Sequence, residues 1–177
     1  MGYWTTRGLR GSVLEELINM TNEVYKQRHV AIIQKIPTPI TPVELDREHG
    51  NISRAFFDHA STVDYIGVVQ GIPICFDAKE TAEARLPLQN VHEHQIEFMR
   101  EYELNGGVAF LLVYFKKTDE YFLLPFEVLK KYWDGAQAGG RKSIPYAAFD
   151  KKLLIHNQNG YALNYLETLN TYLSSKE

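Results

Sequence analysis

The stretch from Asp64 to Lys79 constrains the fold more than any other part of this chain. It holds two apolar runs, Tyr65–Val69 and Ile72–Phe76, on either side of Gln70-Gly71. A two-residue loop that ends in glycine is typical of a short β-hairpin, because such turns require the positive φ angles that glycine adopts readily. The sequence therefore predicts two antiparallel strands joined by a tight turn.

The predicted hairpin brings two carboxylates together, because Asp64 falls directly opposite Asp77 on the neighbouring strand. Like charges that face each other in a sheet, with Cβ atoms about 5 Å apart, are destabilising unless a positive charge lies between them. Asp77 and Lys79 share one face of the strand, while Phe76 and Ala78 point toward the core. Such oxygen ligands suit Mg²⁺, completed by water and substrate phosphate. The alternative is a surface hairpin with an ordinary Asp–Lys ion pair.

The size and composition of the chain predict one domain that spans residues 1–177. Its 177 residues are 45% hydrophobic and 23% charged, and the mean hydropathy is -0.29, as in ordinary globular proteins. No apolar run approaches the roughly 20 residues that span a bilayer, and no apolar signal core precedes the domain, so a cytoplasmic protein without membrane contact is expected. The single cysteine, Cys75, excludes an internal disulfide.

The net charge of -3 and the pI near 6.1 count moderately against a nucleic-acid-binding protein, since such proteins are more commonly basic. Net charge does not describe local patches, however. A metal site would itself supply positive charge where a phosphate must bind.

The periodicity of the remaining segments predicts an α/β fold with a near-continuous apolar strand buried on both faces. The expected elements are a helix over about 13–28, strands at Val30–Ile36, Gly107–Phe115, Glu120–Leu124 and Leu153–Ile155, and helices at His92–Leu104, Phe126–Trp133 and Asn164–Leu173.

An insertion of about residues 43–60 separates the first strand from the hairpin. Pro37, Pro39 and Pro42 precede or open it, and proline cannot continue a strand ladder, so the chain is expected to leave the core in extended conformation. The insertion has no clear period. Segments of this size between two strands are commonly functional, although a surface loop is the alternative.

Several short segments, in order from about Arg10 to about Tyr146, carry a family resemblance. They are Pro37-Thr38-Pro39-Ile40, Ser61-Thr62-Val63-Asp64-Tyr65, Ala78-Lys79-Glu80-Thr81, Pro87-Leu88-Gln89-Asn90, His94-Gln95-Ile96-Glu97 and Gly139-Gly140-Arg141-Lys142-Ser143-Ile144-Pro145-Tyr146. Together they resemble RecU-type Holliday junction resolvases of the PD-(D/E)xK nuclease superfamily, with Val63 in place of a proline and Asp77 in place of the usual Glu. The resemblance implies a restriction-endonuclease-like α/β core, a mixed central sheet flanked by helices, and a protruding stalk formed by the insertion.

The resemblance also implies a metal-dependent endodeoxyribonuclease, a crossover junction resolvase that uses Mg²⁺, or alternatively Mn²⁺, to resolve four-way DNA junctions in recombination and repair. Asp64, Asp77 and Glu15 are the expected metal ligands. Lys79 and Gln95 are expected to join them as catalytic residues, Lys79 by orienting the attacking water or neutralising phosphate charge. Glu15 has a second interpretation, because Ser12-Val13-Leu14-Glu15 also fits the capping box of a helix.

The partners implied are branched DNA, a second copy of the chain in a homodimer, and a recombinase. The glycine-rich segment Gly135–Lys142 could cradle phosphate through its backbone or serve only as a linker. The candidate DNA-binding residues are Thr62, Arg47, Arg54, Arg10, Arg141 and Lys142.

Two other functions remain open at this stage. One is a non-catalytic protein of the same fold that binds junctions or a recombinase, which loss of the acidic residues would favour. The other is a nuclease of the same fold that acts on ordinary duplex DNA, which loss of the stalk would favour. A zinc site at His92 and His94 is disfavoured, because residues two apart on a helix point in different directions.

Overall fold

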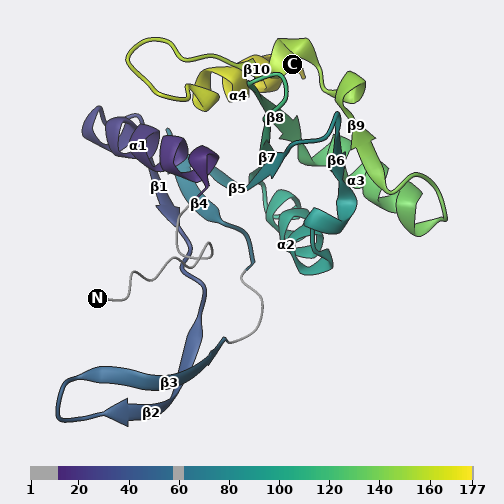
Figure 1. Cartoon of the computed structure of the whole chain (residues 1–177). Coiled ribbons are helices and arrows are strands. Elements are labelled where there is room, and N and C mark those ends of the chain that lie inside the picture. The colour runs from purple at the N-terminus through teal and green to yellow at the C-terminus, as the bar shows by residue number, and fades with distance from the viewer. Residues whose placement is uncertain (1–11, 58–61, 177) are drawn as a thin grey trace.

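The computed structural model describes residues 12–57 and 62–176 and has a mixed α/β fold (Figure 1). In chain order the elements are α1 (Val13–Gln27), β1 (Ala31–Lys35), β2 (Ile40–Asp46), β3 (Asn51–Phe57), β4 (Tyr65–Val69), β5 (Ile72–Thr81), β6 (Arg85–Pro87), η1 (Leu88–Asn90), α2 (Glu93–Leu104), β7 (Val108–Phe115), β8 (Glu120–Pro125), α3 (Phe126–Gln137), β9 (Ser143–Pro145), η2 (Tyr146–Ala148), η3 (Lys151–Leu153), β10 (Leu154–Ile155) and α4 (Tyr165–Ser174).

A six-stranded sheet in the order β1-β4-β5-β7-β8-β10 forms the centre of the molecule. The predicted hairpin is confirmed: β4 and β5 pair antiparallel, with Tyr65 opposite Phe76 and Val69 opposite Ile72. Gln70 and Gly71 form the turn with φ angles of 48° and 89°. β5 and β7 run parallel, connected by the segment that contains α2, and the remaining neighbours are antiparallel.

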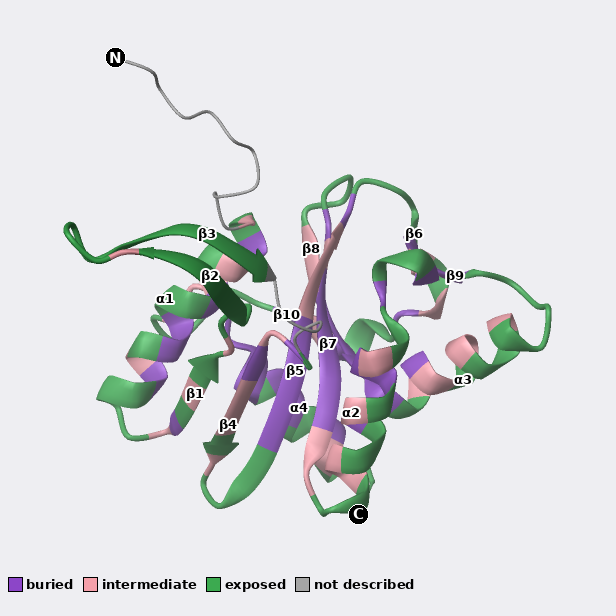
Figure 2. Cartoon of the chain, turned by 90° about the horizontal axis from the view of Figure 1, so that it is seen from below, coloured by how far each residue is buried: buried purple, intermediate pink, exposed green. Residues whose placement is uncertain are grey.

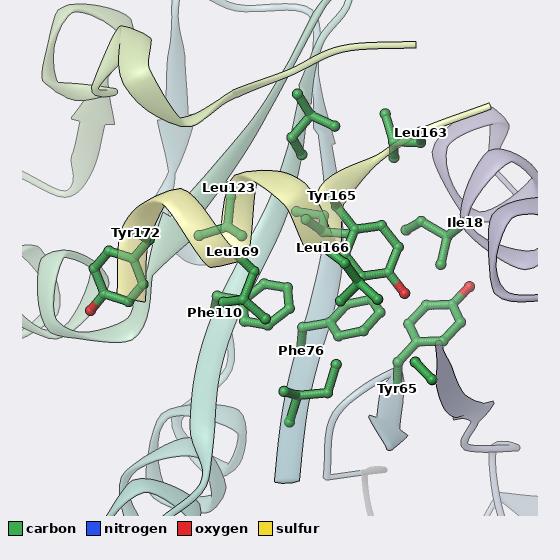
Figure 3. Close-up of a cluster of buried hydrophobic side chains, with 14 of the residues drawn as sticks. Ile18, Tyr65, Phe76, Phe110, Leu123, Leu163, Tyr165, Leu166, Leu169 and Tyr172 are labelled. Atoms are coloured by element: carbon green, nitrogen blue, oxygen red, sulfur yellow. The ribbon is translucent and has the colours of Figure 1, made fainter. Parts of the chain in front are cut away.

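Helices cover both faces of the sheet. Figure 2 shows the central strands β5 and β7 largely buried between these helices. On one face, α1 and α4 pack over an apolar cluster that contains Tyr65, Phe76, Phe110 and Tyr165. The rings of Tyr65, Phe76 and Phe110 lie nearly parallel across three strands, with centroids 4.8 and 4.9 Å apart (Figure 3). On the other face, α2 and α3 cover a second cluster that includes Cys75. Burial on both faces explains why β7 reads as an unbroken apolar run.

The insertion is a two-stranded hairpin, β2 and β3, that projects away from the body of the molecule (Figure 1). It starts at Ile40, earlier than the predicted boundary near residue 43. The prediction that Pro42 cannot lie in a ladder is wrong, because Pro42 sits opposite Ala55 where the register shifts. An irregular two-stranded ladder tolerates proline, since the missing N–H can face solvent. The predicted residues 58–60 lie outside the described residues.

Two further predictions require correction. α3 continues to Gln137, beyond the predicted end at Trp133, so Gly135 lies in the helix and not in a loop. The amides of Gly139 and Gly140 donate to the carbonyls of Ala136 and Gly135, at 3.1 and 2.9 Å. These amides therefore complete the helix end, which leaves the segment little capacity to cradle a phosphate through its backbone. β6 and β9 form a second small sheet that the sequence pattern did not indicate.

No helix in the described part of the chain is both long enough and apolar enough to cross a bilayer.

Candidate active site

Asp64 and Asp77 are held together by backbone hydrogen bonds that cross the hairpin. The backbone N–H of Asp64 donates to Oδ1 of Asp77 at 3.0 Å, and the N–H of Ala78 donates to Oδ2 of Asp64 at 2.9 Å. Asp64 comes directly before β4, and Asp77 lies within β5. The prediction that the two carboxylates are neighbours is therefore confirmed, with each held by an amide from the opposite strand.

Asp77 is fully buried, with 0% of its surface exposed, between Phe76 and Ala78 of the same strand. The alternative of an exposed surface ion pair is therefore wrong. Lys79 Nζ forms an ion pair with Oδ2 of Asp77, and the lysine side chain is itself mostly buried. Within the described residues no donor makes a well-directed hydrogen bond to this oxygen. A buried carboxylate needs compensating charge, and at Oδ2 that charge comes from Lys79.

Burial raises the pKa of Asp64 to about 6, and the charge of Asp77 and a side-chain hydrogen bond with it add to this effect. The Ala78 amide and Lys79 oppose the shift without cancelling it. Two carboxylates in one buried site cannot both ionise without a cost. The two facing carboxylates were predicted to need a positive charge between them. Lys79 supplies only part of that charge, since the pKa of Asp64 remains raised.

Gln95 connects the start of α2 to the carboxylate pair. It is the third residue of the helix, and its Oε1 accepts from the backbone N–H of His92 at 3.1 Å in a capping box. Its Nε2 donates to Oδ1 of Asp77 at 2.9 Å, and the side chain is buried. The amide therefore has both ends satisfied, which fixes the orientation of Asp77.

Glu15 lies in the first turn of α1, where Oγ of Ser12 accepts from its backbone N–H at 3.2 Å. The capping interaction predicted for Ser12 is confirmed. The Glu15 carboxylate forms an ion pair with Lys35 at 2.5 Å. Among residues 12–57 and 62–176, no three His, Cys, Asp or Glu side chains are grouped so as to hold a metal ion. The role of Glu15 as a third metal ligand stays a prediction.

The candidate DNA-binding residues that the structure describes are spread over three regions. Arg47 is exposed in the turn of the β2–β3 hairpin, and Arg54 in β3 pairs with Glu44 at 3.7 Å. Arg141 and Lys142 are exposed directly before β9. Thr62, also exposed, lies two residues before Asp64. Arg10 lies outside the described residues.

Glu80 is a residue that sequence reasoning missed, although it directly follows Lys79. Its Oε1 accepts from the N–H of Leu14 in the first turn of α1 at 2.9 Å, and its Oε2 pairs with Lys116 at 2.6 Å. These contacts lower the pKa of Glu80 in spite of its burial. Glu80 therefore ties the helix that carries Glu15 to the strand that carries Asp77. The only sequence feature that could have drawn attention to Glu80 is its acidic side chain directly after Lys79.

The expectation that His92 and His94 point in different directions is wrong. The rings of His92 and His94 stack at 5.5 Å between centroids, because His92 is the N-cap of α2 and lies outside the helical geometry.

Cys75 is fully buried in the apolar cluster under α2, and burial raises the pKa of its thiol. Both observations indicate a residue that packs in the core and does not act as a nucleophile.

The fold and the site define an α/β protein with two neighbouring carboxylates, one of them fully buried, on a mixed sheet. The chain belongs to the RecU family, since the family model described as "RecU: Recombination protein U" matches residues 9–171. The Holliday junction resolvase RecU of Oenococcus oeni is 44% identical over 167 residues, which cover 92% of this chain and 85% of that protein. That of Ligilactobacillus salivarius is 46% identical over 165 residues, covering 91% and 74%.

Among solved structures, the Holliday junction resolvase Hjc of Archaeoglobus fulgidus aligns with 62% of this chain and 77% of its own, at a TM-score of 0.38 and 8% identity. A likeness of this degree does not by itself define a fold.

Proposed function

We propose that the protein is a Mg²⁺-dependent endonuclease that resolves four-way DNA junctions by paired phosphodiester hydrolysis. Its family supports this proposal, since relatives that cover most of the chain are named Holliday junction resolvases. The observation that carries it in the structure is the pairing of Asp64 with the buried Asp77, which also contacts Lys79 and Gln95. The restriction-endonuclease-like core is part of the same proposal.

The residues present fit a divalent cation. Asp64 and Asp77 would hold it, because both offer hard carboxylate oxygen atoms close together. The raised pKa of Asp64 and the burial of Oδ2 of Asp77 both favour a nearby positive charge. Glu15 is a candidate third ligand if it leaves Lys35. A bound Mg²⁺ activates water and stabilises charge on the phosphate.

The chain itself contributes three functions around this pair. Lys79, beside Asp77, neutralises charge on the scissile phosphate or orients the attacking water. Gln95 holds Asp77 in one orientation through its Nε2, and the Ala78 amide does the same for Asp64. The backbone is thus already arranged for the reaction, which reduces the reorganisation required when substrate binds.

Two matched nicks on opposite strands require two sites related by symmetry, so a homodimer is part of the proposal. The exposed apolar side chains of the hairpin, Ile40, Val43, Leu45, Ile52 and Phe56, are 47–61% exposed in the single chain. Apolar surface of this kind is commonly covered by a partner.

Nicking of a synthetic four-way junction with Mg²⁺ tests the proposal. We expect paired nicks near the branch point, no cleavage with EDTA, and much slower cleavage of a linear duplex of the same sequences. Junction binding without cleavage under any divalent cation would overturn the catalytic assignment. Equal cleavage of duplex and junction would overturn the substrate assignment.

A further inference from the structure

A pocket of about 510 Å³ lies between the C-terminal half of α3 and the segment that follows β6. Its volume falls within the roughly 300–1,000 Å³ of small-molecule sites. Its lining combines apolar residues, among them a tryptophan, with polar residues. The wall residues are Leu88, Val91 and Trp133, and the polar residues are Gln89, Gln137 and Lys142.

The pocket is close to the acidic pair along the chain. Val91 in its wall precedes Gln95 by four residues, and Gln95 donates directly to Asp77. The N–H of Leu88 donates to the carbonyl of Lys142 at 3.1 Å, which ties the two sides of the pocket together. The pocket is therefore linked to the acidic pair through the short segment between Val91 and Gln95.

The charge of the pocket favours an anion. Among the described residues, no carboxylate lines it. Lys142 and its neighbour Arg141 are exposed, and among the described residues neither takes part in an ion pair, whereas Lys116, Lys130 and Lys151 all do. Arg141 donates only to Oγ of Ser143, at 3.1 Å. Other exposed cations of the described chain, such as Lys117 and Lys131, also lack an ion pair. What distinguishes Lys142 is that it lines an apolar pocket.

We propose that this pocket binds one unpaired nucleotide of the DNA substrate, at or next to the branch point. The base stacks on the indole of Trp133, the amides of Gln89 and Gln137 hydrogen-bond its edge, and Lys142 contacts a phosphate. An aromatic ring combined with adjacent cations is the usual platform for an unstacked base. The proposal rests on the proposed function, because the nucleotide comes from the same junction.

Tryptophan fluorescence tests this directly, because Trp4 and Trp133 are the only tryptophans of the chain. In a full-length Trp4→Phe, Asp77→Asn protein, Trp133 is the single emitter and cleavage is blocked. We expect a four-way junction to quench the emission, with the same midpoint as a mobility shift on the same samples. A junction that shifts the protein without changing the emission overturns the pocket proposal. A protein that binds no DNA at all contradicts the proposed function instead.

Matched lysine substitutions supply the second test. Lys142→Gln should lower the slope of log affinity against log salt by about one unit. Lys131→Gln makes the same charge change on exposed α3 surface outside the pocket and should leave the slope unchanged. Equal effects of the two substitutions would overturn the role of Lys142.

Removal of the ring completes the test. Trp133→Ala should weaken junction binding about tenfold, while Trp133→Phe, which keeps an aromatic ring and guards against misfolding, should recover most of it. If Trp133→Ala weakens self-association and leaves junction affinity unchanged, the pocket binds a second copy of the chain and the nucleotide assignment is wrong.

Discussion

At the scale of single residues, the site depends on one fully buried carboxylate. Asp77 receives the Asp64 amide and the Gln95 amide on one oxygen and meets Lys79 on the other. The hairpin pattern predicted Asp64, Asp77 and Lys79, because alternation along a strand and a two-residue turn fix which side chains meet. Gln95 was predicted only through the family resemblance. It did not predict the burial of Asp77, because covering that face requires α2, whose position is set by tertiary packing.

Asp77→Asn should abolish nicking and leave junction binding nearly intact, because the substitution removes a negative charge from the metal site while backbone phosphate contacts remain. We expect the rate to fall by more than about a hundredfold, beyond the 10–100-fold typical for a lost second-shell partner. Nicking and mobility-shift assays on one preparation check this. A parallel loss of both activities would show that Asp77 is structural.

Asp64→Asn should stabilise the metal-free protein at pH 7. The folded pKa of Asp64 is raised to about 6, so its contribution to stability is fully present below the unfolded pKa and is lost as pH rises through about 6. The neutral amide avoids this loss, a gain on the order of 1–3 kcal/mol. Thermal unfolding with EDTA should show the gain at pH 7 and little difference near pH 4. A variant that is less stable than the parent at pH 7 would contradict the assignment.

At the scale of elements, the contact between α1 and β5 depends on Glu80. Its carboxylate accepts from the N–H of Leu14, where the helix dipole favours negative charge, and Lys116 balances it. The sequence predicted α1 and the Ser12 cap correctly, since capping is local. It could not predict that Glu80 accepts from the N–H of Leu14, because Leu14 and Glu80 are 66 positions apart in the sequence.

Glu80→Ala should lower the free energy of unfolding by about 1 kcal/mol, as for the loss of a helix cap. The pKa of Glu80 is lowered by Lys116 and by the amide of Leu14, so its contribution is present above the usual value of 4.5 and is lost as pH falls. Urea unfolding at pH 7 and pH 3.5 measures this. Lys116→Ala, which keeps the cap, is the control and should cost less, since exposed ion pairs contribute little.

The bounds of the hairpin and of α3 were predicted wrongly because the local sequence pattern does not determine them. β2 and β3 pair only with each other, with an irregular register and mostly exposed side chains on both faces, so no clean alternation marks them. α3 passes through Gly135 because a glycine in a helix costs only about 1 kcal/mol, which packing of Phe126 and Leu129 can offset.

At the scale of the whole molecule, the charge of the β2–β3 hairpin argues against binding DNA mainly by attraction to phosphate. Arg47 and Arg54 are accompanied by Glu44, Asp46 and Glu48, and Arg54 is already paired with Glu44. Its exposed surface is rich in apolar side chains instead. Recognition by the hairpin is therefore expected to depend on shape and apolar contact more than on phosphate neutralisation.

Deletion of residues 41–56 tests this. Ile40 and Phe57 face each other across the hairpin, so a short Gly/Ser linker can join them without moving the ends, and the sheet should remain folded. Preference for four-way junctions over linear duplex should fall. The salt dependence should flatten by at most about two units of slope, because only two arginines are removed. A larger change would indicate rearranged contacts elsewhere. If the variant folds, nicks and keeps the same preference, recognition lies outside the hairpin, and the hairpin serves another purpose.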